Sequence, residues 1–191
     1  MNNKNSKNML HNRILWITRT GILTALLITL QWLTAGTQAF AGQYITGTCV
    51  NCILAVSVLV AGLSSGICVA LLSPFFAFLL KIGPAVPQIV PCIAAGNIAF
   101  VLVLHFLVKG EGMRSWKRWT GLLAAALGKF LVLYTLVTKL FIPLMGENLS
   151  SKQVTLFSAM FSWPQLVTAL LGGFAAMLIL PMIQKPINKR R

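Results

Sequence analysis

Long apolar runs recur along this chain, and they leave little room for anything except membrane-spanning helices. Six such runs are separated by short basic, glycine-rich or proline-rich segments, at residues 14–33, 45–61, 67–80, 91–108, 119–142 and 154–183. A helix needs roughly 20 apolar residues to cross the hydrocarbon core of a bilayer. We therefore expect an all-α fold, an integral membrane bundle of six transmembrane helices, with residues 1–191 forming a single membrane domain.

Charge supports this interpretation and predicts an orientation. Only 9% of the residues are charged, whereas a soluble domain has about 25%. Most of the 16 Lys and Arg residues, against 2 acids, lie in the N-terminal tail, the loop after the fourth run and the C-terminal tail. With six helices these three segments share one side, and basic loops are typical of the cytoplasmic side, so both termini are predicted to be cytoplasmic.

The net charge of +14 does not indicate a nucleic-acid partner. Basic and aromatic residues do not alternate on one face, as they would in a nucleic-acid surface. Basic segments that flank apolar runs and lie near anionic lipid explain the charge better. The lipid bilayer is the expected partner, and a multi-pass protein of the cell membrane is the expected location.

The N-terminus could also be interpreted as a secretory signal, with a basic start and a cleavage site at residues 39–41. Its apolar run is long for a signal peptide and is followed by further runs, which favours an uncleaved first helix. Residues 62–66 predict a tight turn, and the proline-rich stretch 83–91 is expected to break the chain between helices. Pro143 is expected to end the fifth helix, and Pro164 to kink the sixth near its start.

Several kinds of chemistry are excluded by the residues present. Residues 128–130 contain a Gly-Lys pair, but the spacing is wrong for a phosphate-binding loop, and Phe130 replaces the required Ser or Thr. The chain has no Asp, and Glu111 and Glu147 lie in loops, which excludes a proton relay built on intramembrane carboxylates. The two histidines lie far apart in the sequence. We expect no catalytic residue, no metal site and no cofactor, and therefore no enzyme.

Cys49 and Cys52 form a C-x-x-C pair inside the second apolar run. Such a pair near a membrane surface could exchange electrons with a quinone, so a small membrane thiol oxidoreductase is one alternative function. Membrane cysteines are more often small apolar side chains in packed helices.

Polar side chains inside the apolar runs are the candidates for ligand binding. Interhelical hydrogen bonds would explain each of them singly. Together, amides and aromatic rings suit an outward-facing pocket for a small amphipathic molecule. The predicted substrate-binding residues are Gln43, Tyr44, Asn97, Lys129, Tyr134, Trp163 and Gln165, with Gln31, Gln38, Asn51 and Thr135 as further polar neighbours.

Lys129 is the most informative of these residues, because it lies near the middle of the fifth run. A charged lysine at the centre of a bilayer costs at least about 2.5–3.5 kcal/mol on insertion scales. Three explanations stay open from the sequence: a neutral amine, an amine bonded to carbonyls or amides, or an amine that awaits an anionic ligand.

Small residues mark possible helix contacts. Gly21 and Ala25 stand four residues apart in the first run, and Gly172 and Gly173 lie in the last. Such positions let helices approach closely, either within the bundle or against another membrane subunit.

In six short helices, a small-x-x-x-small pair and the absence of coupling carboxylates, the chain resembles the substrate-binding S components of energy-coupling factor (ECF) transporters. Residues 73–75 (Ser-Pro-Phe), the prolines of 83–91 and Gly96-Asn97 are similar to segments of that family. The resemblance covers the whole chain in topology and about 45–105 in motif.

The resemblance implies that the chain binds a vitamin or related micronutrient and docks on a transmembrane coupling subunit with two ATPase subunits. It implies that Gly21 and Ala25 occupy the place of the family's docking pair, with Gly21 replacing the first Ala. A transporter without ATP coupling remains a second alternative.

Overall fold

The computed structural model describes residues 2–35, 39–83, 86–108, 115–145 and 148–188, and within these residues the long regular elements are all helices. Two short π-helical segments, η1 (Ser57–Ala61) and η2 (Tyr134–Phe141), continue α2 and α5. The α-helices are α1 (Asn2–Ala35), α2 (Ala39–Val56), α3 (Leu63–Leu79), α4 (Ile89–Val108), α5 (Ser115–Leu133), α6 (Ile142–Met145), α7 (Ser151–Met160) and α8 (Trp163–Asn188).

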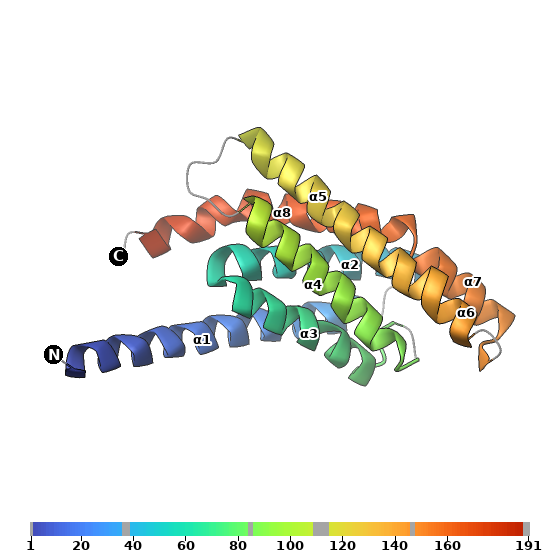
Figure 1. Ribbon diagram of the computed structural model, residues 1–191, viewed down its shortest axis with the longest axis horizontal. Helices are drawn as coiled ribbons and strands as arrows, with labels where there is room; N and C mark the ends of the chain where they lie inside the picture. The colour runs from blue at the N-terminus through green and yellow to red at the C-terminus, as the bar shows by residue number, and fades with distance from the viewer. Residues whose placement is uncertain (1, 36–38, 84–85, 109–114, 146–147, 189–191) are drawn as a thin grey trace.

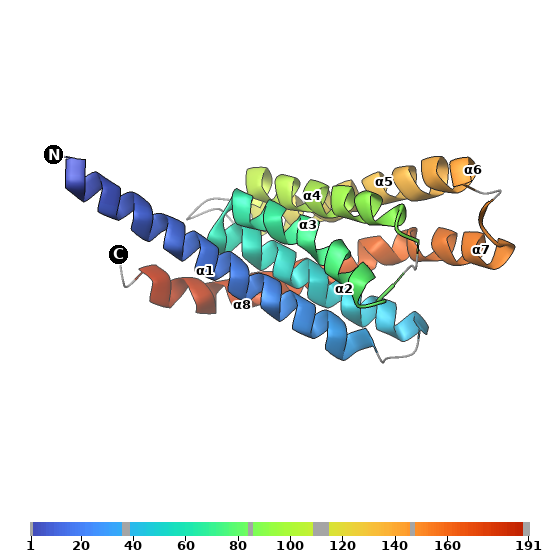
Figure 2. The ribbon, with the colours of Figure 1, turned by 90° about the horizontal axis from the view of Figure 1, so that it is seen from below.

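The long helices run along the longest dimension of the molecule, and α1 begins at the same end of the bundle at which α8 finishes (Figures 1 and 2). Five stretches are long and apolar enough to cross a membrane, at 9–34, 42–61, 89–108, 116–145 and 151–183. Helix α3 is also apolar but has only 17 residues. The prediction of an all-helical membrane bundle is confirmed, whereas the count of six crossings and the cytoplasmic termini stay predictions.

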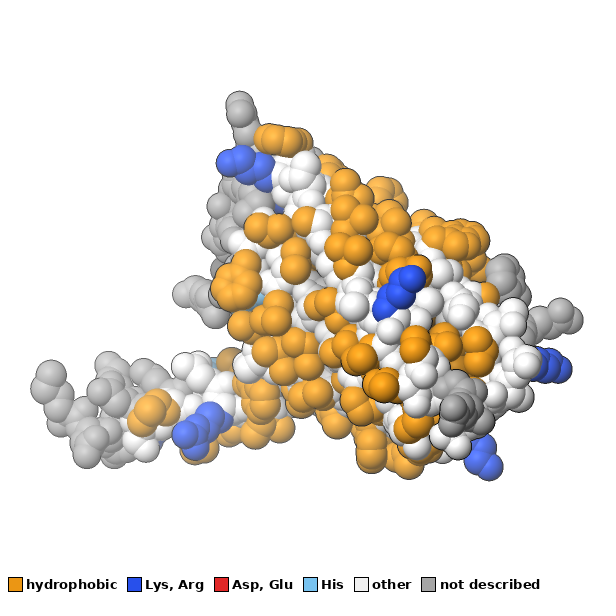
Figure 3. Space-filling model, turned by 45° about the vertical axis from the view of Figure 1, so that its right-hand side comes forward, with side chains coloured by type: hydrophobic (Ala, Val, Ile, Leu, Met, Phe, Trp, Pro, Cys, Tyr) orange, Lys and Arg blue, Asp and Glu red, His pale blue; other side chains and the backbone are white. Residues whose placement is uncertain are grey.

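Apolar side chains form the inside of the bundle and also much of its outside. A central cluster that includes Leu27, Leu54 and Phe100 is fully buried between the long helices. Large apolar side chains also cover outer faces, as the orange surface in Figure 3 shows. Met182, for example, is 74% exposed. An apolar exterior of this extent suits lipid rather than water.

The turn between the second and third helices is shorter than predicted. The chain turns at a single residue, Gly62, whose φ is 95°, and α3 begins at the next residue, Leu63. A glycine adopts this backbone conformation at little cost because it has no Cβ. Gly66, expected in the turn, lies buried in the first turns of α3.

The prolines act differently from the predictions. Pro143 does not end the fifth helix, which continues as η2 and α6 to Met145. At Ile142 the backbone N–H donates to Val137 O, five residues back, so Pro143 falls where the π-helical pattern changes to an α-helix and a missing N–H is tolerated. Pro164 does not kink one helix, because the chain breaks between α7 and α8. It is the second residue of α8, where no N–H partner is needed.

The start of the fourth helix also moves. Helix α4 begins at Ile89, two residues before the predicted start, and therefore includes Pro91 in its first turn. The first amides of a helix have no acceptor within it, so a proline there breaks no bond. The prolines thus break the chain before Ile89 only.

Candidate functional site

A cavity of about 640 Å³ opens between the helices. Its lining comes from α1–α5, α7 and α8 and from the segment that follows α3. It uses the last turns of α1 and α3 and the first turns of α2, α4 and α8, so it lies toward the end of the bundle opposite Asn2 and Asn188. This volume suits a compact organic molecule.

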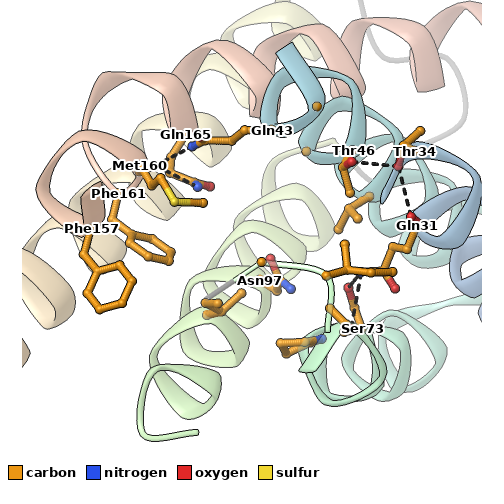
Figure 4. Close-up of a pocket in the computed structure, with 18 of the residues that line it drawn as sticks. Gln31, Thr34, Gln43, Thr46, Ser73, Asn97, Phe157, Met160, Phe161 and Gln165 are labelled. Atoms are coloured by element: carbon orange, nitrogen blue, oxygen red, sulfur yellow. Dashed lines mark hydrogen bonds between the residues drawn. The ribbon is translucent and has the colours of Figure 1, made fainter. Parts of the chain in front are cut away.

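One wall of the cavity is formed by polar side chains of α1, α2 and α3 that hydrogen-bond to one another or to the backbone (Figure 4). Gln31 is 3% exposed and its Nε2 donates to Ser73 O at 3.3 Å and to Ser73 Oγ at 3.4 Å. The Thr46 hydroxyl donates to Thr34 Oγ1 at 2.7 Å. Thr34 Oγ1 lies 2.8 Å from Leu30 O, to which it donates.

The facing wall is organised around the end of α7. Gln43 Nε2 donates to Met160 O at 2.8 Å, and Gln165 Nε2 donates to the same oxygen at 3.1 Å. The carbonyls of the final turn of a helix have no N–H donor within the helix. The amides of Gln43 and Gln165 supply donors to one of these carbonyls. Phe157 and Phe161 lie beside this contact and add aromatic surface (Figure 4).

Lys129 closes the inner side of the cavity. Its Nζ donates to Asn51 Oδ1 at 2.6 Å and to Asn97 Oδ1 at 2.7 Å, and the side chain is 3% exposed. The ring of Phe100 lies 5.9 Å from Nζ, within the range of a cation–π contact. Of the three explanations open from the sequence, the structure shows hydrogen bonds to amides, which use two of the three donors of an ammonium group, and the other two explanations stay open.

Asn97 also connects this cluster to a proline inside α3. Pro74 has no N–H, so the carbonyl of Ala70, four residues earlier, loses its partner in the helix. Asn97 Nδ2 donates to Ala70 O at 3.4 Å. Because an unsatisfied carbonyl is costly away from water, this bond explains why a proline is tolerated there.

The structure brings together four of the seven predicted substrate-binding residues: Gln43, Asn97, Lys129 and Gln165 line the cavity. Of the further polar neighbours, Gln31 also lines the cavity, and Asn51 does not line it but accepts a hydrogen bond from Lys129. Thr135 is exposed, and Gln38 lies outside the described residues.

The three predicted aromatic residues do not line the cavity. Tyr44 packs on Trp163 with ring centroids 6.0 Å apart, and the Trp163 side chain is 58% exposed. Tyr134 stacks on Phe130 with centroids 5.8 Å apart. The aromatic surface comes instead from Phe157 and Phe161.

Sequence reasoning missed other lining residues, among them Thr34, Thr46, Ser73, Lys81 and Gln153. One of them carried a readable signal. Ser150 and Gln153 form a capping box at the start of α7, a pattern that marks a separate helix. Joining α7 to the last apolar run hid it.

Gly21 and Ala25 lie on the exposed side of α1, and a Cβ built on Gly21 has no described atom within 4 Å apart from the adjoining backbone of its own helix. This face is available to another subunit, and its role in docking stays a prediction. Cys49 and Cys52 are free thiols in α2 and are partly buried.

A comparison with protein families identifies the family of this chain. The model of the family "ECF transporter, substrate-specific component" matches residues 15–184. The chain therefore belongs to the substrate-specific components of ECF transporters. It is a substrate-specific membrane subunit of a transport system, and its family consists of transport subunits rather than enzymes. No match reaches significance among curated proteins or among solved structures.

Proposed function

We propose that this chain is the S component of an ECF-type ABC importer in the cell membrane and takes up a vitamin or similar micronutrient. In this proposal it works with a transmembrane coupling subunit and two ATPase subunits. The 640 Å³ cavity, lined by polar side chains from seven helices, is the observation that carries the proposal.

The cavity is proposed to open to the outside. It lies at the end of the bundle away from both termini. The basic segments of the sequence, which favour the cytoplasm, belong to the other end. An importer that receives its substrate outside needs this arrangement.

Lys129 is proposed to contribute to binding an acidic group of the substrate. Two of its three ammonium donors go to Asn51 and Asn97, and within the described residues no third acceptor takes the last one. Lys129 lines the cavity, as does Lys81. A carboxylate or phosphate of the substrate would supply both an acceptor and a compensating charge.

The test of this role is Lys129→Met, which keeps the apolar stem and removes the charge. We expect affinity for the small molecule released from the purified protein to fall at least about tenfold. Lys139→Met is the matched control, because Lys139 is an exposed residue of the same continuous helix. Unchanged binding in Lys129→Met, or a released molecule without an acidic group, would contradict the role of Lys129.

Copurification tests the coupling. When the tagged chain is purified from the membranes of cells that also contain its proposed partners, we expect a coupling subunit and two ATPases to copurify with it. Transport that persists without any ATPase would instead favour the alternative of a transporter that is not coupled to ATP. The thiol oxidoreductase alternative would need a redox-active disulfide between Cys49 and Cys52.

A further inference from the structure

Three of the four glutamines that line the cavity share one arrangement. Gln31 Nε2 donates to Ser73 O, while Gln43 Nε2 and Gln165 Nε2 both donate to Met160 O. A backbone carbonyl can only accept a hydrogen bond, so it fixes which end of each amide faces it. The nitrogen of each glutamine faces the backbone, and the amide oxygen is left for another partner.

These amide oxygens have no donor in the described chain. Gln31 Oε1 is buried and has no hydrogen-bond partner, and because its side chain is only 3% exposed it does not face a bound molecule directly. No described residue donates to Gln43 Oε1 or Gln165 Oε1 either. Gln43 and Gln165 are only partly buried and line the cavity, so a bound molecule can reach their unpaired oxygens with its own N–H or O–H groups.

The threonine hydroxyls of the same walls do not supply the missing donors. The Thr46 hydrogen goes to Thr34 Oγ1, and the Thr34 hydrogen goes to a backbone carbonyl of α1. Gln43 and Gln165 therefore present acceptors to the cavity. Its possible donors are the amines of Lys129 and Lys81, the Ser73 hydroxyl and the amide nitrogen of Gln153, whose oxygen already accepts from Ser150.

We infer that the substrate is rich in hydrogen-bond donors, and that Gln43 and Gln165 select it by each accepting one of its N–H or O–H groups. Polyhydroxylated or amide-bearing compounds fit this chemistry, whereas fatty acids and simple aromatic acids do not. The inference rests on the proposed function, in which this cavity is the substrate site. Selectivity follows because a bound molecule without donors would cover these two oxygens and leave them unpaired.

Gln43 and Gln165 offer a clean test, because they donate to the same carbonyl. In Gln43→Met the amide of Gln165 still satisfies Met160 O, and in Gln165→Met the amide of Gln43 does so. Each single variant thus removes an acceptor from the cavity without leaving the end of α7 unsatisfied. Gln88→Met, at an exposed residue that does not line the cavity, is the matched control.

The experiment exposes the purified chain to the soluble small-molecule extract of the cells that produce it. Retained compounds are identified by mass spectrometry, and their N–H and O–H groups are counted from the mass shift in D₂O. We expect a compound with at least two exchangeable hydrogens besides any acidic proton. We also expect its affinity to fall roughly tenfold in Gln43→Met and in Gln165→Met, and to stay unchanged in Gln88→Met.

Failure of this inference differs from failure of the proposed function. A retained compound without such hydrogens, or full affinity in both glutamine variants, would overturn the inference and leave the cavity as the substrate site. Ala77→Trp fills the cavity, since Ala77 lines it. Retention that survives in a folded Ala77→Trp variant, or no retained compound in the unmodified chain, would overturn both.

Discussion

The link between Pro74 and Asn97 can be measured with a double-mutant cycle. Pro74→Ala restores a backbone N–H that can bond Ala70 O within α3, so the amide of Asn97 is no longer needed there. Asn97→Leu removes that amide and keeps similar volume. The loss of Asn97 should therefore cost more stability beside Pro74 than beside an alanine at 74.

The expected coupling is about 1 kcal/mol. The bond joins a neutral amide to a carbonyl at a long distance of 3.4 Å. Such bonds contribute about 0.5–1.5 kcal/mol net, and interhelical bonds in membranes average about 0.6 kcal/mol. Asn97 also accepts from Lys129, but this loss occurs in both backgrounds and cancels from the cycle.

The assay is the free energy of unfolding in detergent, measured by denaturant titration for the four proteins of the cycle. The Pro143→Ala and Asn97→Leu pair is the matched control, because Pro143 lies in α6 and none of the hydrogen bonds of Asn97 involves it. Coupling within about 0.3 kcal/mol of zero for Pro74 and Asn97, which is ordinary additivity, would refute the role of Asn97 as the substitute donor.

Two further predictions concern the membrane and the partner subunit. A cysteine at Ser150, in a background without other cysteines, should react with an impermeant reagent from outside, and reaction of a cysteine at Arg190 from outside would reverse the proposed topology. Gly21→Leu combined with Ala25→Leu should abolish recovery of the coupling module while small-molecule binding survives, because a Cβ at Gly21 meets no described atom apart from the adjoining backbone of its own helix. Normal recovery of the ATPases with this double variant would reject that interface.

Proline and glycine positions show how far local reasoning reaches. A proline in the sequence predicts a helix irregularity, but whether it starts a helix, as Pro164 does, or is tolerated inside one, as Pro74 is, depends on which donors and acceptors lie nearby. For Pro74 the decisive donor is Asn97 on another helix. The pattern of the sequence could not locate that donor.

The membrane character of this protein and its most informative buried residue followed from the sequence itself. Apolar length and charge are local properties, and a bilayer responds to them directly, because every spanning backbone must satisfy its own hydrogen bonds as a helix. For the same reason Lys129 could be selected without a structure, since a charge near mid-membrane requires a partner.

Only the tertiary structure decided what these residues contact. Gln43 and Gln165 meet at Met160 O, and Lys129 reaches Asn51 across 78 positions of the chain. Tyr44 and Trp163 pack on each other instead of lining the cavity. Inside lipid the hydrophobic effect does not choose between helix faces, so pairing depends on close packing and a few polar bonds between distant residues. That information is not contained in any single apolar run.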